Sequence, residues 1–362
     1  MGWDAETPIE RTEWADWSSQ DQFASWFCAA CMGRLAPASA SDVVCRRCGT
    51  SYPVVDGIPD LRWPRDSTRS IDRDLGDARN LVDASKGREL DAMVRRFFDR
   101  PEWSEATRAM RTRQTLESPR KLRPELEGWL RPCLSRDRPF VDVGCGIGGL
   151  LSAAAQLGYS GSGVDSCMTV LVIAKRMIAS AGGRPVLACG YAESLPLRDG
   201  SVSAVTMYDV IEHVSDADRA ISEADRVVRP GGHVAISTPN RFSMAAEPHV
   251  FLWGVGWLPR RLQRSYVRWR GRAYDGVRLL STGEISRMLG SHDDLRYDLR
   301  VPPVPDDEIR HFGPRRAALA RLYNRVATLK VSRGILLRVG PFFQVMARRS
   351  LDRSTGAPRT DR

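Results

Sequence analysis

The stretch PFVDVGCGIGGLLSAAAQLGYSGSGVDSC, residues 139–167, decides the fold class of this chain. Residues 140–143 are a short apolar run of the kind that forms buried parallel strands. The glycines at 144–148 follow as G-x-G-x-G, which lets the backbone turn tightly and approach a ligand. A helix is predicted from about 149 to 157. A second strand then ends at Asp165, where an acidic side chain about 20 residues beyond the glycines can accept hydrogen bonds from ribose hydroxyls.

The alternation of strands and helices continues downstream of this unit. The expected elements are a helix at about 168–181, a strand at about 185–188, a strand at 202–207, a helix at 216–228 and a strand at 233–237, with Gly231 and Gly232 in the turn before the last strand. Such alternation indicates an α/β protein with a doubly wound parallel sheet.

Several ordered motifs, from PFVDVGCGIGG through DVIEHV to VVRPGGHVAISTPNR, accompany the glycine loop, which by itself also occurs in NAD enzymes. Over residues 140–243 the chain resembles class I S-adenosylmethionine-dependent methyltransferases, especially the branch that includes the quinone-biosynthesis enzymes. The resemblance implies a Rossmann-like, doubly wound sheet of seven mostly parallel strands. Its last strand would be antiparallel and is expected at 341–347.

The resemblance also implies a set of cofactor-binding residues. Residues 142–148 would line the methionine and ribose part of S-adenosylmethionine, Asp165 would hold the ribose hydroxyls, and residues 192–193 would flank the adenine. This chain has Tyr191 where the family commonly has an Asp that bonds the adenine amino group, so Tyr191 could stack on the ring or Glu193 could take the polar role. The full set is Asp142, Gly144, Cys145, Gly146, Gly148, Asp165, Ser166, Ala192, Glu193 and Tyr208.

The candidate catalytic residues follow the strand at 202–207. The resemblance places Tyr208 and Asp209 at the cleft where cofactor and acceptor meet, and His213 lies four residues further on. A histidine there could deprotonate an acceptor hydroxyl, or it could only pack and cap a helix start. Glu212 and His249 are weaker candidates for the base, and the predicted catalytic residues are His213 and Asp209. Alignment of the reactants is expected to supply most of the rate, since it can reach effective molarities of about 10⁵–10⁸ M.

Four of the eight cysteines form a separate motif near the N-terminus. Their spacing is C-x2-C-x13-C-x2-C, and in a reducing compartment two such pairs predict a closed, tetrahedral, structural zinc site. Four unligated core cysteines, or a redox dithiol, are the alternatives. The predicted metal ligands are Cys28, Cys31, Cys45 and Cys48.

The sequence around these cysteines resembles the small zinc-ribbon family that activates RNA and protein methyltransferases. The resemblance covers residues 27–62, and its marks are the two cysteine pairs, Tyr52-Pro53 and the run DGIP at 56–59. It implies a ribbon that either recruits a protein partner or docks on its own catalytic domain.

The formal net charge of +10 is distributed unevenly. Residues 1–62 carry a net charge of −4, which disfavours direct nucleic-acid binding by the ribbon. The aromatic, arginine-rich insert 241–280 carries +6, and residues 311–362 carry +10.

The N-terminus lacks the basic and apolar regions of a signal peptide, and no uncharged apolar run reaches the roughly 18 residues of a spanning helix. We therefore expect a cytoplasmic protein.

Two added segments are the candidates for acceptor recognition. The insert 241–280 could stack a planar or sugar acceptor, pair with a phosphate, or stack RNA bases; otherwise it is a cap whose tryptophans form its own small core. A basic amphipathic helix at about 314–338 could lie on an anionic membrane, or pack its apolar stripe on its own domain. If the helix at about 314–338 lies on a membrane, the protein binds that membrane peripherally.

The sequence thus predicts a zinc ribbon with an acidic N-terminal extension at 1–62, a linker with helices at 63–135, a methyltransferase core at 136–350 and a flexible tail at 351–362. The favoured function is methyl transfer from S-adenosylmethionine to a small or lipid-linked acceptor, at a hydroxyl, by in-line displacement. The alternatives are an RNA methyltransferase with a zinc-ribbon module and a non-catalytic binding module. The intact glycines and Asp165 argue against the non-catalytic reading.

Overall fold

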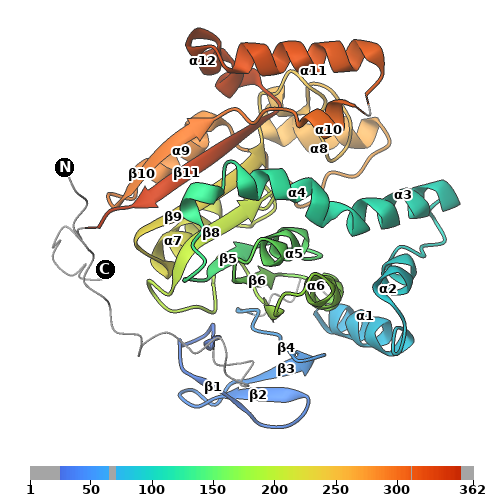
Figure 1. Cartoon of the computed structure of the whole chain (residues 1–362), viewed down its shortest axis with the longest axis vertical. Coiled ribbons are helices and arrows are strands. Elements are labelled where there is room, and N and C mark those ends of the chain that lie inside the picture. The colour runs from blue at the N-terminus through green and yellow to red at the C-terminus, as the bar shows by residue number, and fades with distance from the viewer. Residues whose placement is uncertain (1–24, 65–70, 311, 352–362) are drawn as a thin grey trace.

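The computed structural model describes residues 25–64, 71–310 and 312–351, so the acidic extension before residue 25 and the predicted tail from 352 onward lie outside it. Its centre is a seven-stranded sheet in the order β10-β11-β9-β8-β5-β6-β7 (Figure 1). The strands from β7 through β9 pair in parallel, and β11 runs antiparallel to both β9 and β10. The expected seven-stranded, mostly parallel sheet is confirmed. The strands are β5 Phe140–Val143, β6 Gly161–Asp165, β7 Val186–Cys189, β8 Val202–Tyr208, β9 Val228–Pro239, β10 Leu295–Arg300 and β11 Phe342–Arg349.

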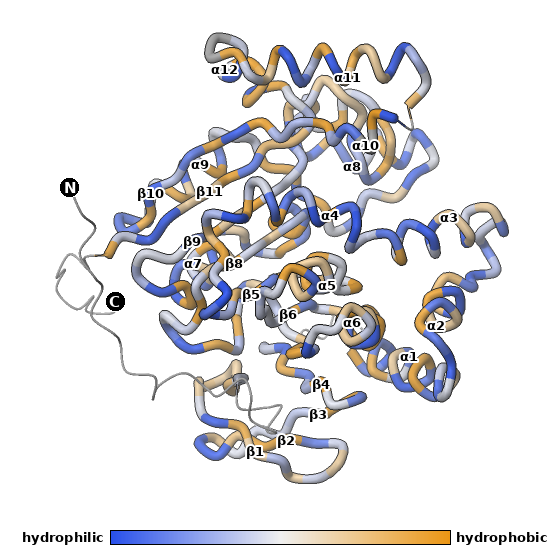
Figure 2. The backbone as a smooth tube through the Cα atoms, viewed as in Figure 1, coloured by the Kyte–Doolittle hydropathy of each residue, from blue (hydrophilic) through white to orange (hydrophobic). Residues whose placement is uncertain are grey.

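Two hydrophobic clusters flank the sheet. One contains apolar residues of α5 and α6 with those of the N-terminal helices α1, α2 and α4, and Figure 2 shows hydrophobic residues along α5 and α6. The other contains residues of α7 and α9. These helices are α1 Ile71–Ala84, α2 Leu90–Phe97, α3 Glu105–Leu116, α4 Ser118–Glu127, α5 Gly149–Gln156, α6 Met168–Ser180, α7 Ala217–Val227 and α9 Thr282–Gly290. Among the described residues, no helix is long and apolar enough to cross a membrane.

The N-terminal ribbon, residues 25–62, is a small four-stranded sheet that docks on its own chain. The amide of Phe27 donates to the carbonyl of Pro196 at 3.0 Å, and the amide of Leu61 donates to the carbonyl of Cys189 at 2.7 Å. Trp26 and Leu61 belong to the same buried cluster as α7. The ribbon therefore docks on its own catalytic domain. The sequence had left open whether it does so or recruits a protein partner. Its strands are β1 Leu35–Pro37, β2 Asp42–Cys45, β3 Ser51–Val55 and β4 Ile58–Pro59.

The single basic helix predicted at 314–338 is two helices, α11 Pro314–Ala327 and α12 Lys330–Val339. Leu329 between them has extended backbone angles, φ −81° and ψ 130°, and so ends the first helix. The hydroxyl of Thr328 donates back to the carbonyl of Arg325 at 2.7 Å, which satisfies an acceptor that a continuous helix would have used. The expectation of one continuous helix is therefore wrong, and the break lies at Leu329.

The two glycines expected in the turn before residue 233 lie inside β9 instead. The register of β9 against β8 jumps from the pair Val202–Val228 to the pair Ala204–His233, so residues 229–232 form a bulge. Gly231 has φ 75°, in the left-handed region that favours glycine. The glycines therefore allow an irregular strand rather than a separate turn.

The insert 241–280 has a small core of its own. That core is built from Val250, Leu252, Val255, Val267 and Tyr274. The insert contains the short helix η2 Val255–Trp257 and the helix α8 Arg260–Trp269. A self-contained cap is therefore the correct description, but its tryptophans are not the core, because Trp253, Trp257 and Trp269 are exposed.

Candidate functional site

A pocket lies at the carboxyl ends of β5, β6 and β8, where ligands of open α/β sheets bind. Seven of the predicted site residues line it, and these are Gly144, Asp165, Ser166, Ala192, Glu193, Asp209 and His213. The remaining lining residues are Val143, Gly190, Tyr191, Val210 and Val214. The glycine loop, the end of the second strand and the loop after β8 therefore meet at one cavity, as the sequence predicts.

The backbone of the glycine loop explains why two of its residues are glycines. Gly144 has φ 69°, and a Cβ atom there would lie 2.3 Å from a methyl carbon of Val210. Gly146 has φ 50°, and its amide donates to the Asp165 carboxylate at 2.8 Å. A side chain at Gly144 would therefore push the pocket wall formed by Val210 out of place.

Asp165 is held at the pocket by two backbone amides. Gly146 donates to Oδ2 at 2.8 Å, and Cys167 donates to Oδ1 at 2.9 Å. Burial raises the pKa of Asp165, while these amide donors act to lower it. Each carboxylate oxygen keeps lone-pair capacity for a further donor, such as the hydroxyls of a ribose.

Five of the predicted cofactor residues do not line the pocket. Cys145, Gly146 and Gly148 belong to the glycine loop but are not among the lining residues. Asp142 is buried and accepts a hydrogen bond from the Thr206 hydroxyl at 2.7 Å, and burial raises its pKa to about 7. Tyr208 turns toward the N-terminal helices, where its hydroxyl donates to Glu125 at 3.2 Å and its ring meets Trp129 edge-on. The sequence placed these residues near the site without revealing where their side chains point.

The two alternatives for the adenine-side residues have different surroundings. The Glu193 carboxylate accepts from the amides of Ser215 and Asp216 at 2.7 and 3.3 Å, which fixes the start of α7. Tyr191 lines the pocket. Both residues therefore reach the pocket, and Glu193 also holds the start of α7.

The predicted base His213 belongs to a cluster that sequence reasoning had not assembled. Its Nε2 lies 3.1 Å from Nε2 of His249, and the two rings meet edge-on. Nδ1 of His249 lies 2.5 Å from the carboxylate of Glu247. His249 and Glu247 come from the insert, and their distance in sequence from His213 left no spacing signal.

Two carboxyl groups accompany this cluster. Burial raises the pKa of Asp209 to about 6, with His249 acting in the opposite direction. Burial and the charge of Asp209 raise the pKa of Glu212 to about 7. Asp209 also has φ 52°, a left-handed conformation that is uncommon for residues other than glycine. The loop after β8 thus brings Asp209 and His213 to the pocket, with the buried Glu212 between them in sequence.

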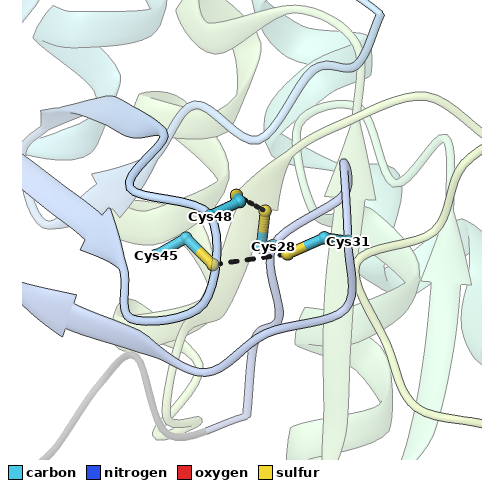
Figure 3. A group of neighbouring side chains, drawn as sticks. All are labelled: Cys28, Cys31, Cys45 and Cys48. Atoms are coloured by element: carbon cyan, nitrogen blue, oxygen red, sulfur yellow. Dashed lines mark hydrogen bonds between the residues drawn. The ribbon is translucent and has the colours of Figure 1, made fainter.

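The four ribbon cysteines converge on one point (Figure 3), and their sulfur atoms lie within 4.8 Å of one another. Sγ of Cys28 is 3.6 Å from that of Cys48, and Sγ of Cys31 is 3.5 Å from that of Cys45. A tetrahedral zinc with bonds of about 2.3 Å holds its sulfurs about 3.8 Å apart, so the four thiols fit the ion. A Cβ atom at Gly33 would come within 2.7 Å of Cys45 Sγ, which leaves no room for a side chain beside the cluster.

Three further groups donate or are placed to donate to the sulfurs. The amide of Arg47 donates to Cys45 at 3.3 Å, and the hydroxyls of Tyr52 and Thr50 lie 3.0 and 3.1 Å from the sulfurs of Cys28 and Cys48. Such donors stabilise thiolates and orient them as ligands. The cluster therefore has the geometry and the surrounding hydrogen bonds of a structural metal site.

A buried ion pair connects the ribbon to the pocket, and no sequence motif indicated it. Arg62 forms a bidentate pair with Asp60, with distances of 2.7 and 3.0 Å. The same guanidinium donates to Asp74 at 2.8 Å and to the carbonyl of Ser166 at 3.1 Å. Since Ser166 lines the pocket, Arg62 joins the end of the ribbon to the cofactor side of the sheet.

Comparisons with known proteins agree with this geometry. Residues 141–236 match the family model of a methyltransferase domain. Two curated relatives, from Cupriavidus pinatubonensis and Pseudomonas paraeruginosa, are both ubiquinone biosynthesis O-methyltransferases and are each 36% identical to this chain, over 126 and 122 residues. Each alignment covers 33% of this chain and 49% of the relative, so the chain spans about half the length of the curated relatives it matches.

A solved structure with a similar arrangement is Haemonchus contortus phosphoethanolamine N-methyltransferase 2 in complex with S-adenosyl-L-methionine. It is 16% identical, with a TM-score of 0.43, and the match covers 72% of this chain and 60% of that one. The family match, together with the pocket at the carboxyl ends of the strands, leads to one assignment: residues 141–236 of this chain are a class I S-adenosylmethionine-dependent methyltransferase domain.

Proposed function

We propose that this protein transfers a methyl group from S-adenosylmethionine to a hydroxyl of a small or lipid-linked acceptor. The observation that carries the proposal is the pocket of the methyltransferase domain, which is lined by Asp165 together with Asp209 and His213. The curated relatives with 36% identity are O-methyltransferases, which supports oxygen as the atom that receives the methyl group.

The proposed reaction is an in-line displacement. The acceptor oxygen forms a bond to the methyl carbon, the carbon–sulfur bond breaks, and the electron pair of that bond stays on sulfur. The hydroxyl proton leaves to a base at the pocket edge, where Asp209 and His213 are the candidates. Because the sulfonium is already a good leaving group, the chain's main task is to align the acceptor oxygen with the methyl group.

Asp165 is the residue proposed to hold the cofactor ribose. Asp165→Ala should weaken S-adenosylmethionine binding by about 1.5–3 kcal/mol, the worth of hydrogen bonds to a charged group, or about 10- to 150-fold in Kd. Isothermal titration calorimetry measures the change. Asp218→Ala, at the exposed first turn of α7, is the matched control and should bind normally. Unchanged affinity in a folded Asp165→Ala protein would remove Asp165 from the site.

The insert offers an exposed aromatic surface for the acceptor. Phe251, Trp253 and Trp269 are 72%, 61% and 78% exposed, and none of them belongs to the small core of the insert. Aromatic side chains that are not needed for folding can stack a planar acceptor or insert into the head-group region of a bilayer. This surface supports an apolar or aromatic acceptor.

The C-terminal helices support a lipid-linked acceptor in particular. Leu319 and Leu322 of α11 and Ile335 of α12 are exposed, so these apolar side chains are not packed on the domain. Ala317 and Ala320 face the inner side of α11 instead. Arginines alternate with the exposed leucines, and an apolar stripe flanked by basic residues suits an anionic membrane surface. The protein is thus proposed to act in the cytoplasm and to bind the membrane peripherally.

Transfer of a labelled methyl group into a cell extract tests the acceptor class. With purified protein and methyl-labelled S-adenosylmethionine, label should move into the organic phase after extraction and should be unaffected by RNase. Addition of anionic vesicles should increase the yield if the acceptor is lipid-linked. Label that stays in the aqueous phase and becomes acid-soluble after RNase treatment would instead establish the RNA methyltransferase.

The four ribbon cysteines are proposed to hold one structural zinc ion. The support is the fit of the four sulfur positions to a tetrahedral ion and the three donors around them. A shell of four thiolates leaves no open position, so the ion would stabilise the ribbon and take no part in methyl transfer.

A further inference from the structure

We propose that Glu212, His213 and His249 form a second metal site, for a divalent first-row transition ion, at the edge of the cofactor pocket. Their ligand atoms lie within 4.8 Å of one another. Glu212 and His213 follow β8, whereas His249 comes from the insert, beyond the residues 141–236 that match the methyltransferase family. The site goes beyond the proposed function, and its existence does not depend on it.

The hydrogen bonds of the two histidines fix which ring nitrogens carry protons. Nδ1 of His249 faces the Glu247 carboxylate at 2.5 Å, and Nδ1 of His213 faces the carbonyl of Gly276 at 3.3 Å. A carbonyl only accepts, and so does an ionised carboxylate, so both Nδ1 atoms are the donors. In neutral rings this leaves both Nε2 atoms as acceptors, and they face each other at 3.1 Å. Two lone pairs at that distance require a positive centre between them, either a proton or a metal ion.

Glu212 decides between these two centres. Its side chain is fully buried, and its Oε2 accepts from the Thr238 hydroxyl at 2.9 Å. Within the described part of the chain, its Oε1 has no hydrogen-bond partner. A buried carboxylate oxygen without a partner is costly. A proton shared by His213 and His249 would leave Oε1 unsatisfied, whereas a metal ion bound by the two histidines can also bind the carboxylate of Glu212.

The two histidines make the hydrogen bonds that histidine ligands usually make in metal centres. A ligating histidine usually donates its other ring nitrogen to a carboxylate or a backbone carbonyl, as His249 does to Glu247 and His213 does to Gly276. Two imidazoles and one carboxylate suit manganese, iron, cobalt or zinc, and three protein ligands leave coordination positions open. Both histidines retain solvent access, which provides an entry path for the ion.

The position of this site has a consequence for the proposed base. If His213 ligates an ion, its Nε2 is not free to take a proton from the acceptor, and Asp209 becomes the remaining candidate at the pocket edge. Glu247 then acts as a positioning residue, since it contacts His249 rather than the ion. The insert would in this way supply both a ligand and the carboxylate that orients it.

Manganese binding to the full-length, zinc-loaded protein tests the site. Mn²⁺ is added alone and followed by electron paramagnetic resonance, because thiolates of the ribbon do not favour this hard ion. One bound Mn²⁺ per chain is expected. Glu247→Gln should weaken binding about 10- to 100-fold, as changes next to metal ligands do, and His249→Ala should weaken it at least as much.

Two further variants keep the result interpretable. Glu212→Gln retains the contact to Thr238 and should also lower the affinity, whereas His292→Ala, outside the cluster, should leave it unchanged. Absence of bound Mn²⁺ in the folded protein would overturn the proposal, and so would binding that is unaffected by both His249→Ala and Glu212→Gln. Since binding is read without S-adenosylmethionine or an acceptor, failure of the proposed methyl transfer would not alter the outcome.

Discussion

Replacing Cys28 and Cys31 together by serine should remove the proposed zinc ion and unfold the N-terminal ribbon. Structural zinc contributes apparent free energies of about 10–16 kcal/mol in zinc-finger peptides, far more than a sheet of four short strands can supply by burial. Native mass spectrometry should show one zinc per chain in the parent protein and none in the variant. Limited proteolysis should then cleave within residues 25–62.

The damage should extend into the methyltransferase domain. Trp26, Cys28, Tyr52 and Leu61 belong to the same buried cluster as the apolar residues of α7. Cys133→Ala is the matched control, because Cys133 is buried outside the ribbon and should leave the zinc content at one ion per chain. A ribbon that stays folded and protease-resistant without metal would contradict the zinc assignment.

Replacing Arg62 by methionine should destabilise the whole chain by about 3–5 kcal/mol. Removing one partner of a buried ion pair leaves the other charge without compensation, and the loss is usually of this size. Asp60 is 1% exposed and would keep its carboxylate in the interior, while Asp74 and the carbonyl of Ser166 would each lose a donor. Guanidinium denaturation followed by tryptophan fluorescence measures the change.

An exposed arginine of the same chain provides the control for this variant. Arg95 pairs with Asp91 on the surface of α2, with 65% of its side chain exposed, and Arg95→Met should leave the stability of the chain nearly unchanged. The double variant Asp60→Leu with Arg62→Met should lose less than the sum of the two single changes, because the fully buried carboxylate of Asp60 is then no longer left without its partner. Equal stability of the Arg62→Met and Arg95→Met proteins would show that the buried ion pair contributes no more to the free energy of unfolding than the exposed pair does.

Much of the fold could be predicted because local patterns determine it. The apolar strand at 140–143, the glycine loop after it and the carboxylate at Asp165 follow one another along the chain, so their geometry depends on few distant contacts. The cysteine pairs are likewise local, since each lies in one turn. The seven-stranded, mostly parallel sheet with an antiparallel last strand followed from the family resemblance, and the strand pairing confirms it.

Side-chain directions were harder to predict than positions. Asp142 and Tyr208 lie where the sequence places them, at the cofactor end of the sheet, yet one bonds Thr206 in the interior and the other turns to Glu125. Neighbouring residues of a strand point to opposite faces of a sheet, and what each meets there depends on helices from elsewhere in the chain. The helix break at Leu329 was likewise not visible in the apolar spacing of residues 314–338.

The sequence by itself determined the methyltransferase domain, its glycine loop and the four cysteines, because each depends on residues that are close together in the chain. Only the tertiary structure brought His249 and Glu247 to His213, and Arg62 to Ser166. Those contacts join segments about 35 to 105 residues apart, and no periodicity or spacing encodes such pairs. They form because the insert folds around its own apolar core and the ribbon docks on the edge of the sheet, and both arrangements are set by burial over the whole chain.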